Sequence, residues 1–154
     1  AEGTGKTFKA LGCCVMLLDE REGTLVTVGS HGLSDAYLTK GPIVVDAQHC
    51  AFTMGKPVFI ENGPDDPRIQ YPEEARAEGI HSLLSVPIKS RGVTIGLLRI
   101  YHGKGWMPHE EDVDSLCVLA EQFGVVMENH GLKNFLSGVQ LAMSSLPLRL
   151  LGED

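Results

Sequence analysis

Residues 79–101 read GIHSLLSVPIKSRGVTIGLLRIY, two runs rich in Leu, Ile, Val and Ser on either side of a short polar turn. The turn contains Gly92, which accepts the positive φ that tight hairpin turns require. Pro87 has no N–H to give to a sheet ladder, so it marks a strand end or a bulge. The stretch therefore predicts two β-strands, at 80–88 and 93–101, paired as a hairpin.

Short strands and helices alternate on either side of this hairpin. Residues 11–19 form a continuous apolar run, typical of a central strand covered on both faces, and residues 24–30 alternate as its hairpin partner. The other expected elements are a helical turn at 34–38, a helix at 47–54 capped by Asp46, an edge strand at 57–61, a helix at 72–78 and a long helix from Pro108 to about residue 129. Strands joined mostly by hairpins indicate an α+β fold around a mostly antiparallel sheet of five to six strands.

The long helix carries more apolar surface than one sheet face requires. Its first stripe follows 3-4 spacing and is explained by core packing: Val113, Leu116, Ala120, Phe123 and Met127. Leu119, Val125 and Val126 are the excess, which favours contact with a helix of a second chain. Gly131 bends or stops the helix, and a second stripe predicts that it resumes before Pro147: Leu132, Leu136, Val139, Met143 and Leu146.

The chain therefore divides into three parts. Residues 1–10 are expected to end an N-terminal helix that joins the dimer contact, residues 11–130 to form the domain, and residues 131–154 to form a helical extension whose last residues are a chain terminus. With 154 residues, one domain with a single core is expected.

Composition excludes several classes of partner. A net charge of −7 argues against nucleic acid and anionic membrane, which both need a basic surface. No apolar run reaches the roughly 18 residues of a membrane span, and the first ten residues lack the apolar core of a secretory signal, so a cytoplasmic location is expected. The four cysteines and six histidines show no metal-ligand spacing, so no metal site is expected.

Several segments, in order over residues 11–130, resemble the GAF family. They are the hairpin with its S-x-L-x-V-P and I-G-L-L motifs, GSHGLSDAYLTKGP at 29–42, GKPV at 55–58, DPRIQYPEEARAEGI at 66–80, and the Glu-Gln and Glu-Asn pairs at 121–122 and 128–129. The resemblance implies a GAF/PAS-like fold, with terminal helices on one face of the sheet and loops with short helices on the other. GAF domains are small-molecule-sensing and dimerising modules, seldom enzymes.

The departures from the family motifs limit the cofactor. The N-K-x-x-F-x-x-x-D-E motif of the cyclic-nucleotide-binding branch is absent from the sequence, and the Cys-His order of bilin-binding relatives is reversed here at His49 and Cys50. A haem-binding relative needs an axial histidine, for which His49 and His81 are the candidates, but a lone histidine is more often a loop or edge residue. Cyclic nucleotide, bilin and haem are therefore disfavoured, and the cofactor is left unknown.

A charged residue in the second hairpin strand marks the expected ligand site. Arg99 and Tyr101 share a strand face with Ile95 and Leu97, because side chains alternate with period two. A cation at mid-strand must find water, a carboxylate or an anionic ligand. One interpretation is an anion-binding arginine under a lid formed by residues 64–80.

The other interpretation is an internal ion pair of Arg99 with Asp66, Glu74 or another acidic residue of the lid. Two residues of the lid, Arg68 and Tyr71, carry the same two interpretations.

One enzymatic alternative remains open, since some GAF proteins reduce free methionine sulfoxide with cysteines. Cys50 beside His49 is the candidate nucleophile, while Cys13, Cys14 and Cys117 fall on apolar segments. The sequence thus predicts a non-catalytic, small-molecule-sensing GAF domain of bacterial signalling type that forms a homodimer through its terminal helices. The alternatives are a dimerisation scaffold with a degenerate pocket and a thiol-dependent reductase.

Overall fold

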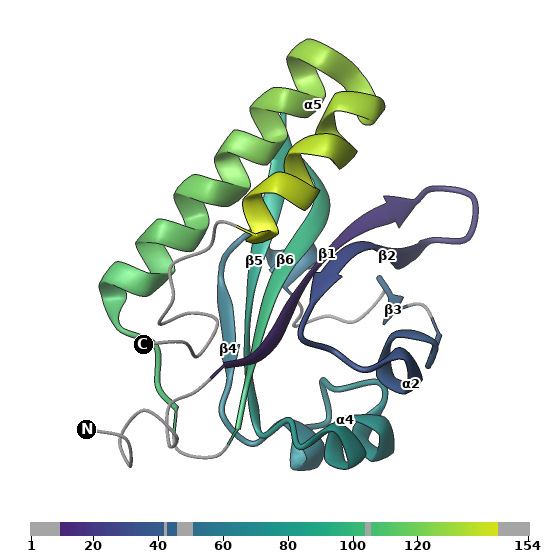
Figure 1. Cartoon of the computed structure of the whole chain (residues 1–154), viewed down its shortest axis with the longest axis vertical. Helices are drawn as coiled ribbons and strands as arrows, with labels where there is room; N and C mark the ends of the chain where they lie inside the picture. Colours follow the sequence, from purple (N-terminus) through teal and green to yellow (C-terminus); the bar gives the residue numbers. More distant parts are fainter. Residues whose placement is uncertain (1–9, 42, 46–50, 104–105, 145–154) are drawn as a thin grey trace.

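The computed structural model describes residues 10–41, 43–45, 51–103 and 106–144 (Figure 1). Over these ranges the chain forms a six-stranded antiparallel sheet in the order β3-β2-β1-β6-β5-β4. The strands are β1 (Ala10–Asp19), β2 (Thr24–His31), β3 (Ile43–Val44), β4 (Val58–Ile60), β5 (Ser82–Ser90) and β6 (Val93–His102). The helices are α2 (Asp35–Leu38), α3 (Ala51–Met54), η1 (Gly63–Asp65), α4 (Pro72–Glu78) and α5 (Glu110–Ser144). The predicted α+β fold is confirmed.

The predicted hairpin is the β5–β6 pair. Its turn residues Arg91 and Gly92 both have positive φ, at 53° and 78°, as a two-residue hairpin turn requires. Pro87 lies inside β5 and does not end it, and the register shift follows one residue later, between Ile88 and Lys89. This bulge changes the alternation in β6 and brings Ile95 against the helix-covered side of the sheet, where the sequence had placed it with Tyr101.

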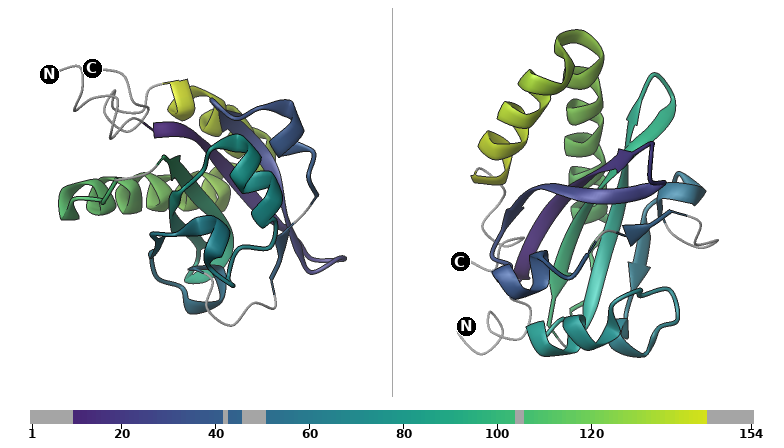
Figure 2. Two further views of the ribbon diagram at one scale, coloured as in Figure 1. Left: turned by 90° about the horizontal axis from the view of Figure 1, so that it is seen from below. Right: turned by 90° about the vertical axis from the view of Figure 1, so that its right-hand side faces the viewer.

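Helix α5 bends back on itself and covers one face of the sheet with two arms (Figures 1 and 2). The first arm packs on β5 so closely that Gly124 lies against the backbone of Lys89. The return arm packs on β2, where Val139 and Met143 lie over Gly29. The bend expected near Gly131 is therefore confirmed, although the helical hydrogen-bonding pattern continues through it.

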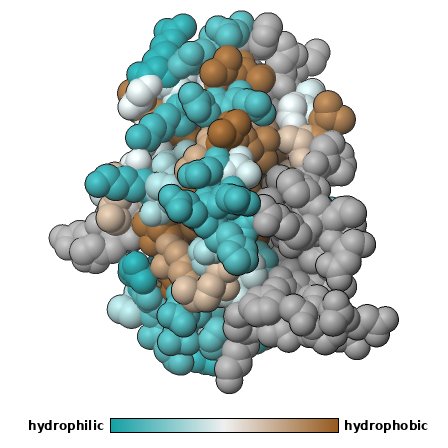
Figure 3. Space-filling model, turned by 90° about the vertical axis from the view of Figure 1, so that its left-hand side faces the viewer, coloured by the Kyte–Doolittle hydropathy of each residue, from teal (hydrophilic) through white to brown (hydrophobic). Residues whose placement is uncertain are grey.

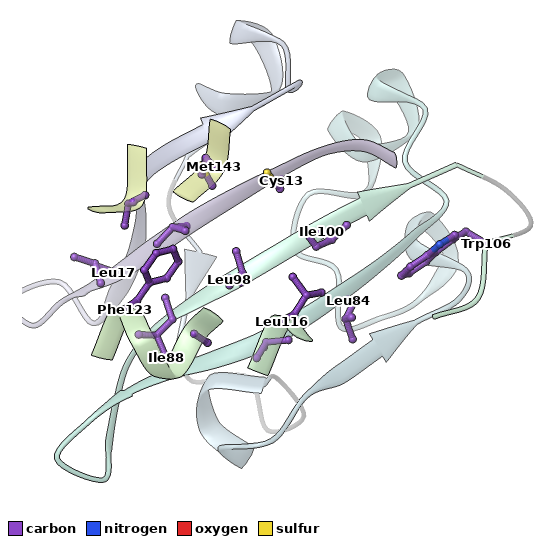
Figure 4. Packing of buried hydrophobic residues seen from close by; sticks show 14 residues of the cluster. Cys13, Leu17, Leu84, Ile88, Leu98, Ile100, Trp106, Leu116, Phe123 and Met143 are labelled. Carbon is purple, nitrogen blue, oxygen red and sulfur yellow. The ribbon is translucent and has the colours of Figure 1, made fainter. Parts of the chain in front are cut away.

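We call this covered side the helix face. Its core joins the sheet to both arms of α5 (Figure 4) through residues that include Cys13, Leu17, Leu84, Ile88, Leu98, Ile100, Leu116, Phe123 and Met143. Leu119 and Val126 pack against this core, so part of the apolar excess of the long helix is used within the chain. Val118 and Val125 remain exposed on α5.

The opposite side, which we call the lid face, is covered by α2, α4 and the loops between strands (Figure 2). Its apolar cluster unites sheet and lid: Cys14, Met16, Leu25, Leu83, Leu97 and Tyr101 from the strands, with Tyr37, Ile43, Ala51, Ala75 and Ile80 from the covering segments. The helix predicted at 72–78 is α4, with the left-handed Gly79 at its C-cap. The sheet thus separates a helix face from a lid face, as predicted.

Three expectations need correction or fall outside the described ranges. Ala10, expected in a helix, begins β1 because it pairs with His102 of β6; residues 1–9 are not described. The helix expected from 47 is described only from Ala51, and Asp46 with residues 47–50 lies outside the described ranges. The strand β3 was not predicted, because two residues are too short to show an alternating pattern. Among the described helices none combines the length and apolarity that a bilayer crossing requires.

Candidate functional site

The site is built around Arg99, a buried cation in the middle of the lid face. Its neighbours across the sheet are Cys14 on β1 and Ser85 on β5. The Arg99 Nε donates a hydrogen bond to Ser85 Oγ at 2.9 Å. Within the described ranges no carboxylate lies within 4.0 Å of the guanidinium, so the ion pair considered with Asp66 or Glu74 does not form there.

Two tyrosines surround the guanidinium. Tyr101 lies two residues along the same strand, and its ring meets that of Tyr37 from α2 edge to face, with centroids 5.6 Å apart. The Tyr101 hydroxyl lies 3.5 Å from the Cys14 sulfur. Burial raises the pKa of Tyr37 to about 12 and raises that of Tyr101 well above its ordinary value. Both phenols therefore stay protonated and can donate hydrogen bonds.

A second cation, Lys40, lies over the ring of Tyr37 and near that of Tyr71. Its Nζ is 4.0 Å from the centroid of the Tyr37 ring and 5.6 Å from that of Tyr71. Burial lowers the pKa of Lys40 and the charge of Arg99 lowers it further, while Cys14 and two glutamates oppose the shift. For Arg99 itself burial lowers the pKa, but Tyr101 and Cys14 raise it more. Two cations thus share one partly desolvated cluster.

The lid over this cluster is held by one carboxylate. Glu78, the last residue of α4, accepts hydrogen bonds from both the backbone N–H of Ser34, at 2.7 Å, and the Ser34 hydroxyl. Ser34 in turn caps α2, since its Oγ accepts from the Tyr37 N–H at 3.2 Å. The Ser34–Glu78 contact therefore fixes the helix that carries Tyr37 to the helix that follows Tyr71.

Of the other predicted site residues, only some belong to this cluster. Tyr71 is half-buried and belongs to the cluster through Lys40. Arg68 does not, because it binds Asp66 through two hydrogen bonds of 2.9 and 2.7 Å, which lower the pKa of that carboxyl and raise that of the guanidinium. His81 lines a separate hollow of about 330 Å³ with Pro64, Asp65, Arg76, Gly79 and Ile80. His49 lies outside the described ranges.

Sequence reasoning missed three members of the cluster. Cys14 was treated as a structural thiol, and Tyr37 and Lys40 were seen only as part of the motif at 29–42. Tyr37 and Lys40 lie three residues apart at the end of a short helix. This spacing was the available signal, because it places a cation above an aromatic ring. What it did not reveal is that the ring lies against Tyr101.

The described thiols are not activated. Burial raises the pKa of Cys13 to about 12, and it also raises the pKa values of Cys14 and Cys117. Thiol catalysis needs the opposite shift, since the thiolate is the nucleophile. Cys50 lies outside the described ranges. In those ranges no group of three or more His, Cys, Asp or Glu side chains is placed to hold a metal ion.

Comparisons with known proteins agree on the fold. The GAF domain family model matches residues 1–127. The chain is similar to a domain of a protein described as a two-component sensor histidine kinase from Sinorhizobium meliloti 1021, with 24% identity, a TM-score of 0.64, and coverage of 77% of this chain and 79% of that one. It is also similar to the GAF domain of a phosphoenolpyruvate-protein phosphotransferase from Acinetobacter, with 21% identity, a TM-score of 0.62, and coverage of 76% and 70%.

An enzyme shares the fold as well. The type II free methionine-R-sulfoxide reductase from Thermoplasma acidophilum is 18% identical, with a TM-score of 0.63 and coverage of 84% of this chain and 86% of that one. A search of curated protein sequences finds no match. At these identities the solved structures show a common fold and nothing finer, so function must be argued from the site.

Proposed function

The chain belongs to the GAF family, and we propose that it is a signalling-type GAF domain that binds a small molecule on its lid face and catalyses no reaction. The observation that carries the proposal is Arg99, a cation only 8% exposed with no carboxylate partner in the described ranges. Burying an unpaired charge is costly, and an anionic group bound beside it would offset that cost. Sensor-protein neighbours of the same fold support the signalling role.

The sheet provides a route from the ligand to the helix. Arg99 alternates along β6 with Leu98 and Ile100, which pack on the helix face against Leu116 of α5 (Figure 4). Because protein interiors are close-packed, a displacement of β6 by a ligand is felt by the helix behind it. A ligand that binds one arrangement of β6 and α5 more tightly shifts the population toward it.

The proposal predicts ligand-dependent stabilisation that requires Arg99. At a concentration 100 times its Kd, a ligand should add about 2.7 kcal/mol to the free energy of unfolding. That gain corresponds to a rise in Tm of several degrees in a thermal-shift screen of anionic, neutral and cationic metabolites. The shift should disappear in Arg99→Met and persist in Arg21→Met, a change at an exposed arginine in the β1–β2 turn.

Two results would contradict this function. A screen without any stabilising compound would favour a dimerisation scaffold with a degenerate pocket. Turnover of free methionine sulfoxide that is lost in Cys50→Ser would favour the reductase, whose fold the chain shares. The raised pKa values of Cys13, Cys14 and Cys117 support the proposal that the domain is not a thiol enzyme.

We also propose that the domain forms a homodimer through α5. The outer face of the helix is mostly hydrophilic, with small apolar patches between hydrophilic side chains (Figure 3). Val118 and Val125, 53% and 47% exposed, lie seven residues apart and therefore on one side of the helix. Val125 also borders a groove of about 430 Å³ with basic residues on the hairpin and acidic ones on α5: Lys89, Arg91, Glu121 and Glu128. Such a surface can complement a second copy of itself.

If the dimer forms through this face of α5, a double substitution there should lower the measured mass, and a control substitution elsewhere should not. Val118→Lys combined with Val125→Lys should convert the protein to a monomer, because two charges would enter an apolar contact. Val93→Lys is the control, since Val93 is 64% exposed at the β5–β6 turn and outside the helix. Light scattering coupled to size exclusion measures the mass. A wild-type monomer at micromolar concentration, or a dimer that survives the double change, would contradict the proposed interface.

A further inference from the structure

The side chains gathered around Arg99 are mostly hydrogen-bond donors. A guanidinium has five N–H groups and no acceptor; in the described structure the Arg99 Nε donates to Ser85, and the guanidinium also interacts with the Tyr101 hydroxyl. The ammonium of Lys40 adds three donors. The Tyr37 and Tyr101 hydroxyls interact with each other, and that of Tyr101 also lies against the Cys14 sulfur, so these protons are partly engaged within the cluster. The Cys14 sulfur beside Tyr101 is a weak acceptor. A molecule bound here must therefore present several acceptor atoms.

The cluster also has an excess of positive charge. Glu74 and Glu78 attract Lys40, but among the described residues neither lies within 4.0 Å of either cation. Glu78 already accepts two hydrogen bonds from Ser34. The lid acid Asp66 is bound by Arg68. The carboxylates of the lid are thus engaged elsewhere or more distant, and among the described residues neither cation has a carboxylate in direct contact.

The two cations approach the site from different elements. Arg99 projects from the sheet, whereas Lys40 follows α2 and is only half-buried above the Tyr37 ring. The backbone next to Lys40 comes close to the lid because Gly41, with φ of 129°, has no side chain: a Cβ there would lie 2.6 Å from the Tyr71 hydroxyl. This close approach sets the lysine over the cluster, where its ammonium lies against the Tyr37 ring.

We propose that the ligand of this site is a small, doubly charged oxyanion bound between Arg99 and Lys40, an inference that rests on the function proposed above. The planar guanidinium binds one oxyanion group through two parallel hydrogen bonds, and the ammonium binds the second charge as a point cation. The phenols of Tyr37 and Tyr101 donate to the remaining oxygens. Dicarboxylates and phosphate monoesters share this chemistry.

Lys40 is then the residue that selects for charge. A ligand with one negative charge would use Arg99 and gain little from Lys40, whereas a dianion would use both. Because Lys40→Gln removes a charge-assisted hydrogen bond, it should weaken dianion binding about 10- to 100-fold. The affinity for a monoanion should be nearly unchanged. Arg99→Met should abolish both. Lys56→Gln, at an exposed lysine after α3, is the matched control.

The experiment is titration calorimetry of the full chain with two series of compounds that differ in charge. Succinate, succinamate and succinamide carry two, one and no negative charges, and glycerol 3-phosphate is compared with glycerol. We expect succinate or glycerol 3-phosphate to bind, the uncharged compounds not to bind, and the preferred series to identify the oxyanion. The melting temperature of Lys40→Gln without ligand confirms that the variant folds.

The outcomes separate this inference from the function beneath it. Binding of a neutral or cationic metabolite that depends on Arg99 would contradict the dianion as ligand but agree with the proposed sensing function. Equal loss of dianion and monoanion affinity in Lys40→Gln would assign Lys40 a structural role and overturn its selective one. If neither dianion binds, the ligand class is wrong. If no metabolite of any charge stabilises the protein, the sensor itself is wrong.

Discussion

Gly124→Ala is expected to lower the free energy of unfolding by about 3 kcal/mol, because overpacking against a backbone cannot be relieved by turning a side chain. A Cβ at Gly124 would lie 1.8 Å from the carbonyl oxygen of Lys89, on strand β5. To accept even one methyl group, the first arm of α5 must move away from the sheet. The higher helix propensity of alanine, worth about 1 kcal/mol, opposes the loss but does not cancel it.

The same helix supplies the control. Gly138 lies on the return arm, and a Cβ there would meet nothing within 4 Å. Gly138→Ala should therefore stabilise the protein by about 0.5–1 kcal/mol through helix propensity alone. Urea denaturation followed by circular dichroism measures both changes. Similar effects at the two glycines would mean that α5 and β5 are not in the contact described here.

The free energy of unfolding should fall steeply in mild acid because of His102. This side chain is fully buried and stacks on Trp106, with ring centroids 3.5 Å apart and an interplanar angle of 2°. Neither ring nitrogen forms a hydrogen bond with a described residue, and burial lowers the pKa of His102 from 6.5 to about 3. The folded protein therefore keeps this imidazole neutral where the unfolded chain protonates it.

The sign follows from proton counting. Between about pH 6.5 and 3 the unfolded state binds one more proton at His102, so stability rises with pH across this window, by up to about 1.4 kcal/mol per unit. The contribution is complete above pH 6.5 and is lost as pH falls toward 3. His102→Phe keeps a ring on Trp106 but cannot titrate, so its free energy of unfolding should depend less on pH.

Chemical denaturation at several pH values tests this expectation. Any steric cost of the larger phenylalanine ring is the same at every pH and leaves the difference in slope intact. His31→Phe is the comparison, because His31 is exposed at the end of β2. Parallel pH profiles for the wild type and His102→Phe would show that His102 is not held neutral in the folded state.

Local sequence signals predicted the elements that local chemistry specifies. The hairpin followed from its glycine turn and paired apolar runs, and α4 followed from Pro72 and the acidic residues of its first turn. The two faces of β6 were predicted correctly for Leu97 to Tyr101, because alternation holds over that stretch. The prediction was wrong for Ile95, because a β-bulge depends on pairing with the partner strand and does not show in the alternation of β6 itself.

Features that join distant segments were not predicted. Arg99 and Tyr101 were found because a charge and a phenol stand out in an apolar strand. The cluster they belong to also needs Lys40 and Tyr37, which reach it only through the packing of α2 on the sheet. The apolar excess on α5 suggested a second chain, yet the return arm of the same helix provides part of that cover. An apolar sequence pattern indicates that a helix surface is covered, but it does not indicate which segment covers it.

The contact between Ser34 and Glu78 has a kinetic consequence. It links α2 and α4 across 44 residues of sequence, so neither helix can leave the sheet without breaking the same two hydrogen bonds. The two helices therefore form one opening unit, of the kind that local unfolding follows in folded proteins. For the ligand proposed above, entry and exit at Arg99 would require this opening, so its association rate would fall below that of free diffusion and its release would be slow. The opening of α2 and α4, rather than diffusion, would then set how fast the proposed sensor responds.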